Sequence, residues 1–125
     1  MQMAEVWATN SHSTRAKVGA LIVKDISIIS DGYNGTPAGF DNRCETKTGQ
    51  TLFYVLHAEA NAIAKLATGT NSSTGSTLYV TMSPCVQCAK LIIQAKISRV
   101  VYREQYRDVS GILLLEMAKI KVDRI

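Results

Sequence analysis

Residues 78–95 read LYVTMSPCVQCAKLIIQA, and this stretch decides the expected fold. The run Leu78–Thr81 predicts a short central strand. Pro84 predicts the start of a helix, because proline is favoured at the first helical position. Leu91 and Ile92 continue the buried stripe of that helix. The stretch therefore predicts a strand that leads directly into a helix.

The rest of the chain repeats this alternation. Further strands are expected at residues 18–23, 26–30, 99–102 and 120–125, and further helices at 2–9, 58–69 and 109–118. Alternating strands and helices indicate an α/β fold, here a three-layer α/β/α sandwich with a mixed sheet of about five strands. The 125 residues are about one domain long and contain no linker or repeat, so we expect a single domain over residues 1–125.

Composition narrows the function classes. Hydrophobic residues make up 46% and charged residues 19%, as in ordinary folded proteins. No apolar run reaches the ~20 residues of a membrane span, and residues 1–7 lack a secretory signal pattern, so a cytoplasmic protein is expected, in the host cytoplasm if the source is viral. The net charge of +4 suits an acidic small molecule such as a nucleotide and would also suit RNA. Because the basic residues are scattered, we expect no nucleic-acid partner and no membrane partner.

A small group of residues predicts metal chemistry. His57 and Glu59 lie two residues apart, and Cys85 and Cys88 lie three apart. One imidazole and two thiolates are three zinc ligands, and a catalytic zinc site uses three protein ligands with water in the fourth position. Zinc lowers the pKa of bound water from 15.7 to roughly 7, which makes a zinc-bound hydroxide easier to form by roughly 12 kcal/mol. Glu59 is then available to carry protons, work worth ~10²–10⁴-fold in rate.

Two other interpretations of these residues stay open at this point. Cys44 could be a fourth ligand, which would make the zinc structural and inert, since structural sites normally close with four Cys or His ligands. Cys85-x-x-Cys88 could be a thioredoxin-like redox pair, although that interpretation leaves His57 and Glu59 without a purpose. His-x-Glu combined with Pro-Cys-x-x-Cys is the pattern of zinc nucleobase deaminases, which favours catalytic zinc.

The motifs also carry a family resemblance. His57-Ala58-Glu59-Ala60-Asn61-Ala62-Ile63 and Ser83-Pro84-Cys85-Val86-Gln87-Cys88-Ala89-Lys90 look like the two zinc motifs of the cytidine deaminase superfamily. Lys17-Val18-Gly19-Ala20 and Gly32-Tyr33-Asn34-Gly35-Thr36-Pro37-Ala38-Gly39 resemble, more narrowly, the deoxycytidylate (dCMP) deaminases of the compact bacterial and phage type. The similarity runs from about Arg15 to Tyr106 and implies a cytidine deaminase-like fold.

This resemblance implies a role for each matching residue. His57, Cys85 and Cys88 would hold zinc, and Glu59 would be the proton shuttle. Asn34 would hold the deoxyribose hydroxyl, the Ala58 backbone would contact the pyrimidine, and Tyr106 would lie near the base and phosphate, with Thr36 also at the substrate.

The implied activity is hydrolytic deamination of dCMP to dUMP and ammonia, supplying dUMP for thymidylate synthesis. Members of the family tend to form homohexamers that are activated by dCTP with Mg²⁺ and inhibited by dTTP. The effector phosphates are expected near Arg15, Lys17, Asn34 and Gly35.

The chain departs from the family pattern in one place. Many relatives carry a second, structural zinc between the Gly-Tyr-Asn-Gly loop and the His-Ala-Glu helix, with extra Cys and His ligands. Only Cys44 lies in that region here, so we expect one zinc per chain. The alternatives are a tRNA adenosine deaminase, a deaminase of free cytidine, guanine or a riboflavin precursor, and a non-catalytic zinc-binding module.

Overall fold

The computed structural model describes all 125 residues, which form four helices and five strands. The helices are α1 (Gln2–Ala8), α2 (Ala58–Leu66), α3 (Val86–Gln94) and α4 (Ser110–Met117), and the strands are β1 (Gly19–Lys24), β2 (Ser27–Tyr33), β3 (Thr77–Met82), β4 (Arg99–Glu104) and β5 (Lys121–Arg124). The strands form one sheet in the order β2-β1-β3-β4-β5. β1 is antiparallel to β2 and β3, whereas β3, β4 and β5 are parallel, so the sheet is mixed as expected.

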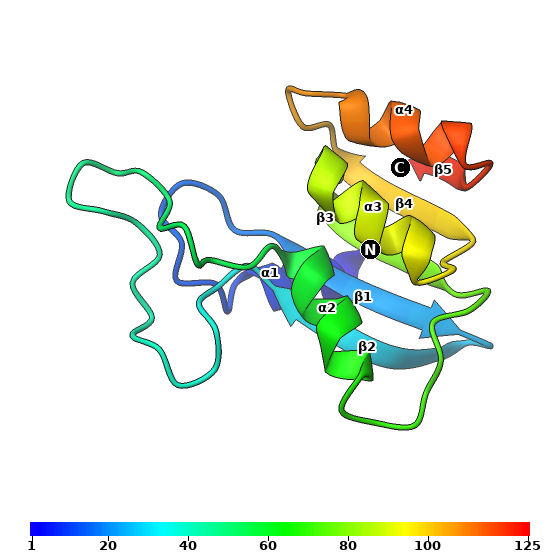
Figure 1. The fold of residues 1–125 in the computed structure, drawn as a ribbon, viewed down its shortest axis with the longest axis horizontal. Helices are drawn as coiled ribbons and strands as arrows, with labels where there is room; N and C mark the ends of the chain where they lie inside the picture. Colours follow the sequence, from blue (N-terminus) through cyan, green and yellow to red (C-terminus); the bar gives the residue numbers. More distant parts are fainter.

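The helices cover both faces of this sheet. Helices α2, α3 and α4 lie on one face, and α1 lies on the other (Figure 1). The main hydrophobic core lies between the sheet and the three helices and includes Ile22, Leu78, Val80, Ile92 and Leu115, all fully buried. The expected α/β/α sandwich of about five strands is therefore confirmed.

The second strand is longer than its sequence predicts. The sequence predicts a strand that ends at residue 30 and a loop that includes Gly32, but β2 continues to Tyr33. Gly32 stays in the strand because helix α2 packs against its Cα. A side chain there would place its Cβ 2.4 Å from the carbonyl oxygen of Ala58 and 2.7 Å from the amide nitrogen of Ala62. The glycine thus allows α2 to approach the sheet, and it is not a turn residue.

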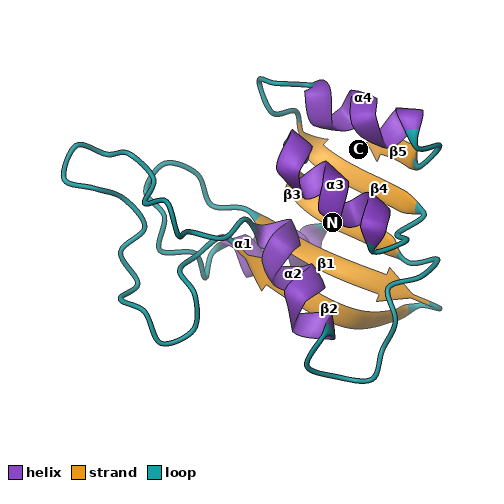
Figure 2. Ribbon diagram, in the orientation of Figure 1, coloured by secondary structure: helices purple, strands orange, loops and turns teal.

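Two irregular segments project from the same side of the sheet. They are residues 9–18, between α1 and β1, and residues 34–57, between β2 and α2, and both lie at the left of Figures 1 and 2. The hydroxyl of Ser11 donates a hydrogen bond to the carbonyl oxygen of Asn34 at 2.7 Å, which joins them. An isolated bridge between Gly35 and Leu56 closes the base of the longer segment. The two segments therefore form one irregular wall beside the N-terminus of α2.

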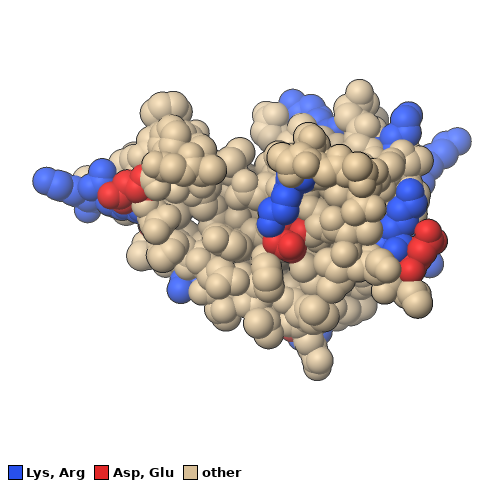
Figure 3. All heavy atoms as spheres, turned by 90° about the horizontal axis from the view of Figure 1, so that it is seen from below, with Lys and Arg blue, Asp and Glu red and all other residues tan.

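The surface charges are unevenly distributed over the face that Figure 3 shows. Several Lys and Arg side chains gather at the right edge of this view, others stand apart in uncharged areas, and some lie directly beside acidic groups (Figure 3). The structure contains an ion pair between Lys65 and Asp31. No helix in the structure combines the length and the apolar character that crossing a membrane requires.

Candidate active site

Two helix N-termini bring the three predicted metal ligands together. His57 is the N-cap of α2, Cys85 is the N-cap of α3, and Cys88 lies in the first turn of α3. Neither N-cap side chain makes a capping hydrogen bond, and both face the same point. The Nδ1 atom of His57 lies 3.5 Å from Sγ of Cys85 and 3.4 Å from Sγ of Cys88. The structure thus unites residues that are far apart in the sequence.

These distances fit a tetrahedral zinc ion. A nitrogen about 2.0–2.1 Å and a sulfur about 2.3 Å from the same tetrahedral zinc lie about 3.5 Å apart. The ligand atoms of His57, Cys85 and Cys88 all lie within 4.8 Å of one another, and no fourth Cys, His, Asp or Glu joins the group. Cys44 instead places its thiol 3.4 Å from the carbonyl oxygen of Asn42. The donor set therefore has the three-ligand form of a catalytic site.

The electrostatics of the cluster favour a cation. Hydrogen bonds from Cys88 and His57 lower the pKa of Cys85 to about 3. The hydrogen bond to Cys85 and burial raise the pKa of Cys88. The hydrogen bond to Cys85 also raises the pKa of His57. The pair of sulfurs consequently carries a stable thiolate, and the positive ends of two helix dipoles point at it. Such a site is prepared for a metal that prefers sulfur and nitrogen ligands.

Glu59 lies beside this cluster as a buried carboxyl group. It is only 4% exposed, and burial raises its pKa to about 7. Its position in the first turn of α2, two residues after the predicted metal ligand His57, explains this placement. A carboxyl group with a pKa near the working pH can both accept and donate a proton, which is the requirement for a general acid–base.

A glycine of α4 supports the turn that carries Cys85. A Cβ on Gly111 would lie 2.1 Å from the carbonyl oxygen of Pro84 and 2.8 Å from the carbonyl carbon of Cys85. Only a residue without a side chain allows this approach. The packing of α4 therefore helps to define the position of Cys85, one of the predicted metal ligands.

We expect Gly111→Ala to weaken metal binding as well as the fold. The added methyl must push the Pro84–Cys85 turn away, which costs about 1–3 kcal/mol in overpacking and moves the Cys85 sulfur. Zinc affinity, measured by competition with a chromogenic chelator, should fall by about 10–100-fold. Gly69→Ala is the matched control, because a Cβ at Gly69 meets nothing within 4 Å. Equal zinc affinity in the two variants would contradict this role of Gly111.

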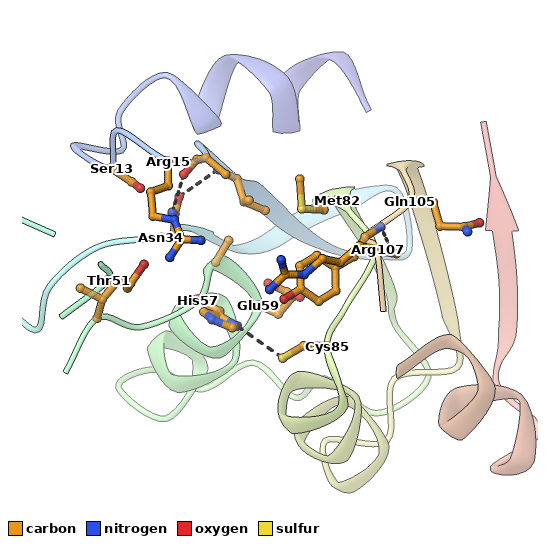
Figure 4. Close-up of a pocket in the computed structure, with 16 residues that line it drawn as sticks. Ser13, Arg15, Asn34, Thr51, His57, Glu59, Met82, Cys85, Gln105 and Arg107 are labelled. Carbon is orange, nitrogen blue, oxygen red and sulfur yellow. Dashed lines mark hydrogen bonds between the residues drawn. The ribbon is translucent and has the colours of Figure 1, made fainter. Parts of the chain in front are cut away.

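A cavity of about 420 Å³ opens next to the cluster and is large enough for a small ligand. Figure 4 shows His57, Glu59 and Cys85 at one part of the cavity and Arg15 and Asn34 along another. The wall includes Ser13, Arg15, Ala16, Val18, Asn34, Thr51, Val55, Ala58, Met82, Ser83, Gln105, Tyr106 and Arg107. The metal cluster and the ligand cavity thus form one site.

The structure places most of the predicted substrate residues in this cavity. Asn34, Ala58 and Tyr106 line it, whereas Thr36 is not among the lining residues. The side chain of Asn34 already accepts a hydrogen bond from the amide of Val18 at 2.8 Å and donates one to the carbonyl oxygen of Ala16 at 2.8 Å. One N–H and one lone pair of this side-chain amide remain for a ligand.

The predicted effector residues lie in different places. Arg15 and Asn34 line the main cavity. Lys17 lines a smaller cavity beside α1, together with Glu5 and Glu104. The fourth predicted residue, Gly35, pairs with Leu56. The four residues therefore do not gather at one point.

The sequence interpretation missed Arg107, whose guanidinium lies 5.9 Å from the centre of the Tyr106 ring. A usable signal was present, because residues 105–107 directly follow the end of β4, and ligands bind at the carboxyl ends of parallel strands. The loop is held by the amide of Tyr106, which donates to the hydroxyl of Ser83 at 2.7 Å. Arg15 and Arg107 together make part of the cavity wall positive.

Comparison with known proteins supports the same family as the motifs. Residues 1–104 match the model of the cytidine and deoxycytidylate deaminase zinc-binding region. The deoxycytidylate deaminase of Enterobacteria phage T4 is 35% identical in an alignment 147 residues long. This alignment covers 85% of this chain and 76% of the relative. The deoxycytidylate deaminase of Saccharomyces cerevisiae is 35% identical in an alignment 132 residues long, which covers 98% of this chain but only 42% of that protein.

A solved structure is more similar still. The crystal structure of dCMP deaminase from the cyanophage S-TIM5, in complex with dCMP and dUMP, superposes with a TM-score of 0.97 at 44% identity. The match covers 99% of this chain and 92% of the cyanophage chain. The similarity therefore extends over both projecting segments as well as the sheet.

Proposed function

This chain belongs to the cytidine and deoxycytidylate deaminase zinc-binding family, and we propose that it hydrolyses dCMP to dUMP and ammonia. The observation that carries the proposal is the His57, Cys85 and Cys88 cluster with buried Glu59 beside it, at the edge of a cavity with two arginines. The cluster accounts for the reaction type, and the arginines account for a phosphorylated substrate. The deoxycytidylate deaminases among its relatives support this choice.

The cluster would hold one zinc ion. Zinc in such a site lowers the pKa of a water molecule from 15.7 to about 7 and so supplies a nucleophile at neutral pH. His57, Cys85 and Cys88 orient that chemistry toward the cavity. The Ala58 backbone, at the start of α2, holds the edge of the pyrimidine ring next to it.

Glu59 carries the protons. It takes a proton from the attacking water as the new carbon–oxygen bond forms at C4 of the cytosine ring, and it gives this proton to ring N3. It then passes the remaining proton to the amino group, the C4–N bond breaks, and ammonia leaves as the C4 carbonyl forms. The raised pKa of Glu59, about 7, suits both transfers at neutral pH.

The arginines select the nucleotide. Arg15 and Arg107 line the cavity, and neither guanidinium forms an ion pair within the chain. We place the substrate phosphate at this positive part of the wall, with Tyr106 against the base and Asn34 at the deoxyribose hydroxyl. Charge-assisted hydrogen bonds from a guanidinium to a phosphate are strong and specific.

Arg107→Ala should therefore raise KM for dCMP by about 10–100-fold, the loss of one charge-assisted hydrogen bond. Turnover of deoxycytidine, which has no phosphate, should change little. Arg103→Ala is the matched control, because Arg103 pairs with Glu5 at 3.2 Å and does not line the cavity. Steady-state rates with dCMP and deoxycytidine check the prediction. An equal loss for both substrates would remove Arg107 from phosphate recognition.

An ultraviolet assay with a substrate series tests the proposed function itself. We expect the highest kcat/KM for dCMP and much lower values for deoxycytidine, cytidine and guanine. A preference for an unphosphorylated substrate, or turnover of tRNA adenosine alone, would overturn the assignment.

Regulation and assembly extend the proposal. Lys17, outside the main cavity, and Gly35 are candidate contacts for the phosphates of dCTP, which would bind with Mg²⁺ and activate, and of dTTP, which would inhibit. Thr36 is a further candidate near the substrate. Exposed apolar side chains on α1 and α4, such as Val6 and Met117, support assembly into a homo-oligomer, with a hexamer proposed. We place the enzyme in the cytoplasm, where its product would supply thymidylate synthesis.

The same assay with dCTP and with dTTP tests the regulation. Activation by the first and inhibition by the second are the expected results, and a rate that responds to neither would contradict the proposal.

A further inference from the structure

Residues 11–18 form a wall of the active-site cavity without helix or strand structure. Four of them, Ser13, Arg15, Ala16 and Val18, line the cavity. Because the segment lacks a regular backbone ladder, its conformation depends on side chains from elsewhere in the chain. Asn34 holds its end through the Ala16 carbonyl and the Val18 amide.

The other anchor of this wall is Glu45. Its Oε2 atom accepts hydrogen bonds from the hydroxyl of Ser13 at 2.7 Å, the amide of Thr14 at 3.0 Å and the amide of Arg15 at 3.4 Å. Glu45 is 7% exposed and Ser13 is 5% exposed. The hydrogen bond from Ser13 is the largest cause of a lowered pKa for Glu45. A buried carboxylate that accepts three converging hydrogen bonds holds the donor backbone in one conformation.

Glu45 itself belongs to the longer irregular segment, residues 34–57. It forms an isolated antiparallel bridge with Thr51, and the amide of Leu52 donates to the carbonyl oxygen of Cys44 at 2.8 Å. Thr51 lines the cavity. The single side chain of Glu45 therefore ties the segment that carries Arg15 to the segment that carries Thr51.

Arg15 depends on this tie for its direction. Its side chain makes no ion pair within the chain, and its backbone amide bonds to Glu45. Without a partner of its own, the guanidinium can reach only the positions that the Arg15 backbone allows. Figure 4 shows Arg15 at the cavity beside Asn34.

We propose that Glu45 is a positioning residue that holds Arg15 toward the phosphate of the bound nucleotide and so contributes to the preference for dCMP over deoxycytidine. The inference rests on the proposed function. It goes further because it assigns nucleotide selectivity to a carboxylate that does not line the cavity and cannot touch the substrate.

The experiment compares Glu45→Ala with Glu45→Gln in the zinc-loaded full chain, using dCMP and deoxycytidine. Glu45→Ala should raise KM for dCMP about tenfold with kcat little changed, since the contact at risk is one charge-assisted hydrogen bond. The kcat/KM for deoxycytidine should stay near the wild-type value. Glu45→Gln keeps a carbonyl oxygen where the three donors converge and should recover most of the lost affinity.

Coupling to Arg15 separates positioning from general weakening. Arg15→Ala should produce the same loss of preference, and adding Glu45→Ala to it should cause little further loss, because both changes remove one contact. Additive losses would overturn the proposal. So would a Glu45→Gln variant as impaired as Glu45→Ala, because charge rather than the hydrogen-bonded geometry would then be responsible.

Two further variants keep the test decisive. Ser76→Ala removes a buried hydroxyl that donates to Ser73 at 2.6 Å, outside the residues that line the cavity, and should leave the dCMP preference intact. Ser13→Ala removes one of the three donors to Glu45. If Glu45→Ala does not fold, this variant replaces it and should show a smaller shift of the same kind.

Wild-type protein that does not prefer dCMP defeats the proposed function. Wild-type preference with an unaltered Glu45→Ala variant defeats only the positioning role.

Discussion

Glu59→Gln is expected to lower kcat for dCMP by about 10²–10⁴-fold while one zinc ion stays bound to each chain. The substitution keeps the size of the side chain but removes its ability to exchange a proton. Glu59 is not within the group of metal ligands, so its loss should not release the metal. The measurement is the initial rate of dCMP loss by absorbance, together with zinc per chain by elemental analysis on the same sample.

The outcome separates an enzyme from a binding module. A folded, zinc-loaded Glu59→Gln variant that deaminates at the wild-type rate would show that another group carries the protons. Wild-type protein with zinc but without activity on any nucleobase would support the non-catalytic zinc module. Glu5→Gln is the matched control, because Glu5, on α1, is a half-exposed carboxylate that pairs with Arg103 of β4. Its rate should match the wild type.

Cys85→Ala is expected to lower zinc affinity by more than about 100-fold, the upper end of the cost of losing a supporting contact to a metal ligand. Deamination should fall to background, because without the metal the water nucleophile is roughly 12 kcal/mol harder to form. Removing zinc from the wild type with a chelator should give the same loss of activity. Added zinc should restore the activity of the wild type but not that of Cys85→Ala. Chelator titration and the dCMP assay measure both effects.

Cys44→Ala is the matched control for this prediction. Cys44 is buried, at 1% exposure, but lies outside the metal cluster. The variant should retain one zinc per chain and its activity. Loss of zinc from Cys44→Ala, or two zinc ions per wild-type chain, would contradict the expectation of a single three-ligand site.

The metal cluster was predictable because local rules place its members. His57 precedes an alanine-rich helix, and Pro84 predicts the start of the next one to within two residues, because α3 begins at Val86 rather than at the proline. Both ligand motifs therefore lie at helix N-termini. In an α/β fold these N-termini follow the sheet and point to the same edge. The spacing of Cys85 and Cys88 then sets both sulfurs on one side of a first turn. Each step depends only on residues near the motif.

Contacts between distant segments were not predictable in the same way. Gly32 sits in a glycine-rich stretch that favours a loop, and only the packing of α2 shows that it belongs to β2. Glu45 looks like one charge in a polar loop, because its donors lie about 30 residues earlier. Neither role leaves a periodic pattern in the sequence. The fold and the His57, Cys85 and Cys88 cluster thus follow from local chemistry, whereas the cavity wall follows from tertiary contacts.

The most direct test of this account is a crystal structure of the zinc-loaded protein, phased at the zinc absorption edge. We predict one zinc per chain, with two sulfurs at about 2.3 Å, one nitrogen at about 2.0–2.1 Å, and a fourth position that no protein atom fills. A fourth protein ligand on that ion, or a disulfide between Cys85 and Cys88, would contradict it.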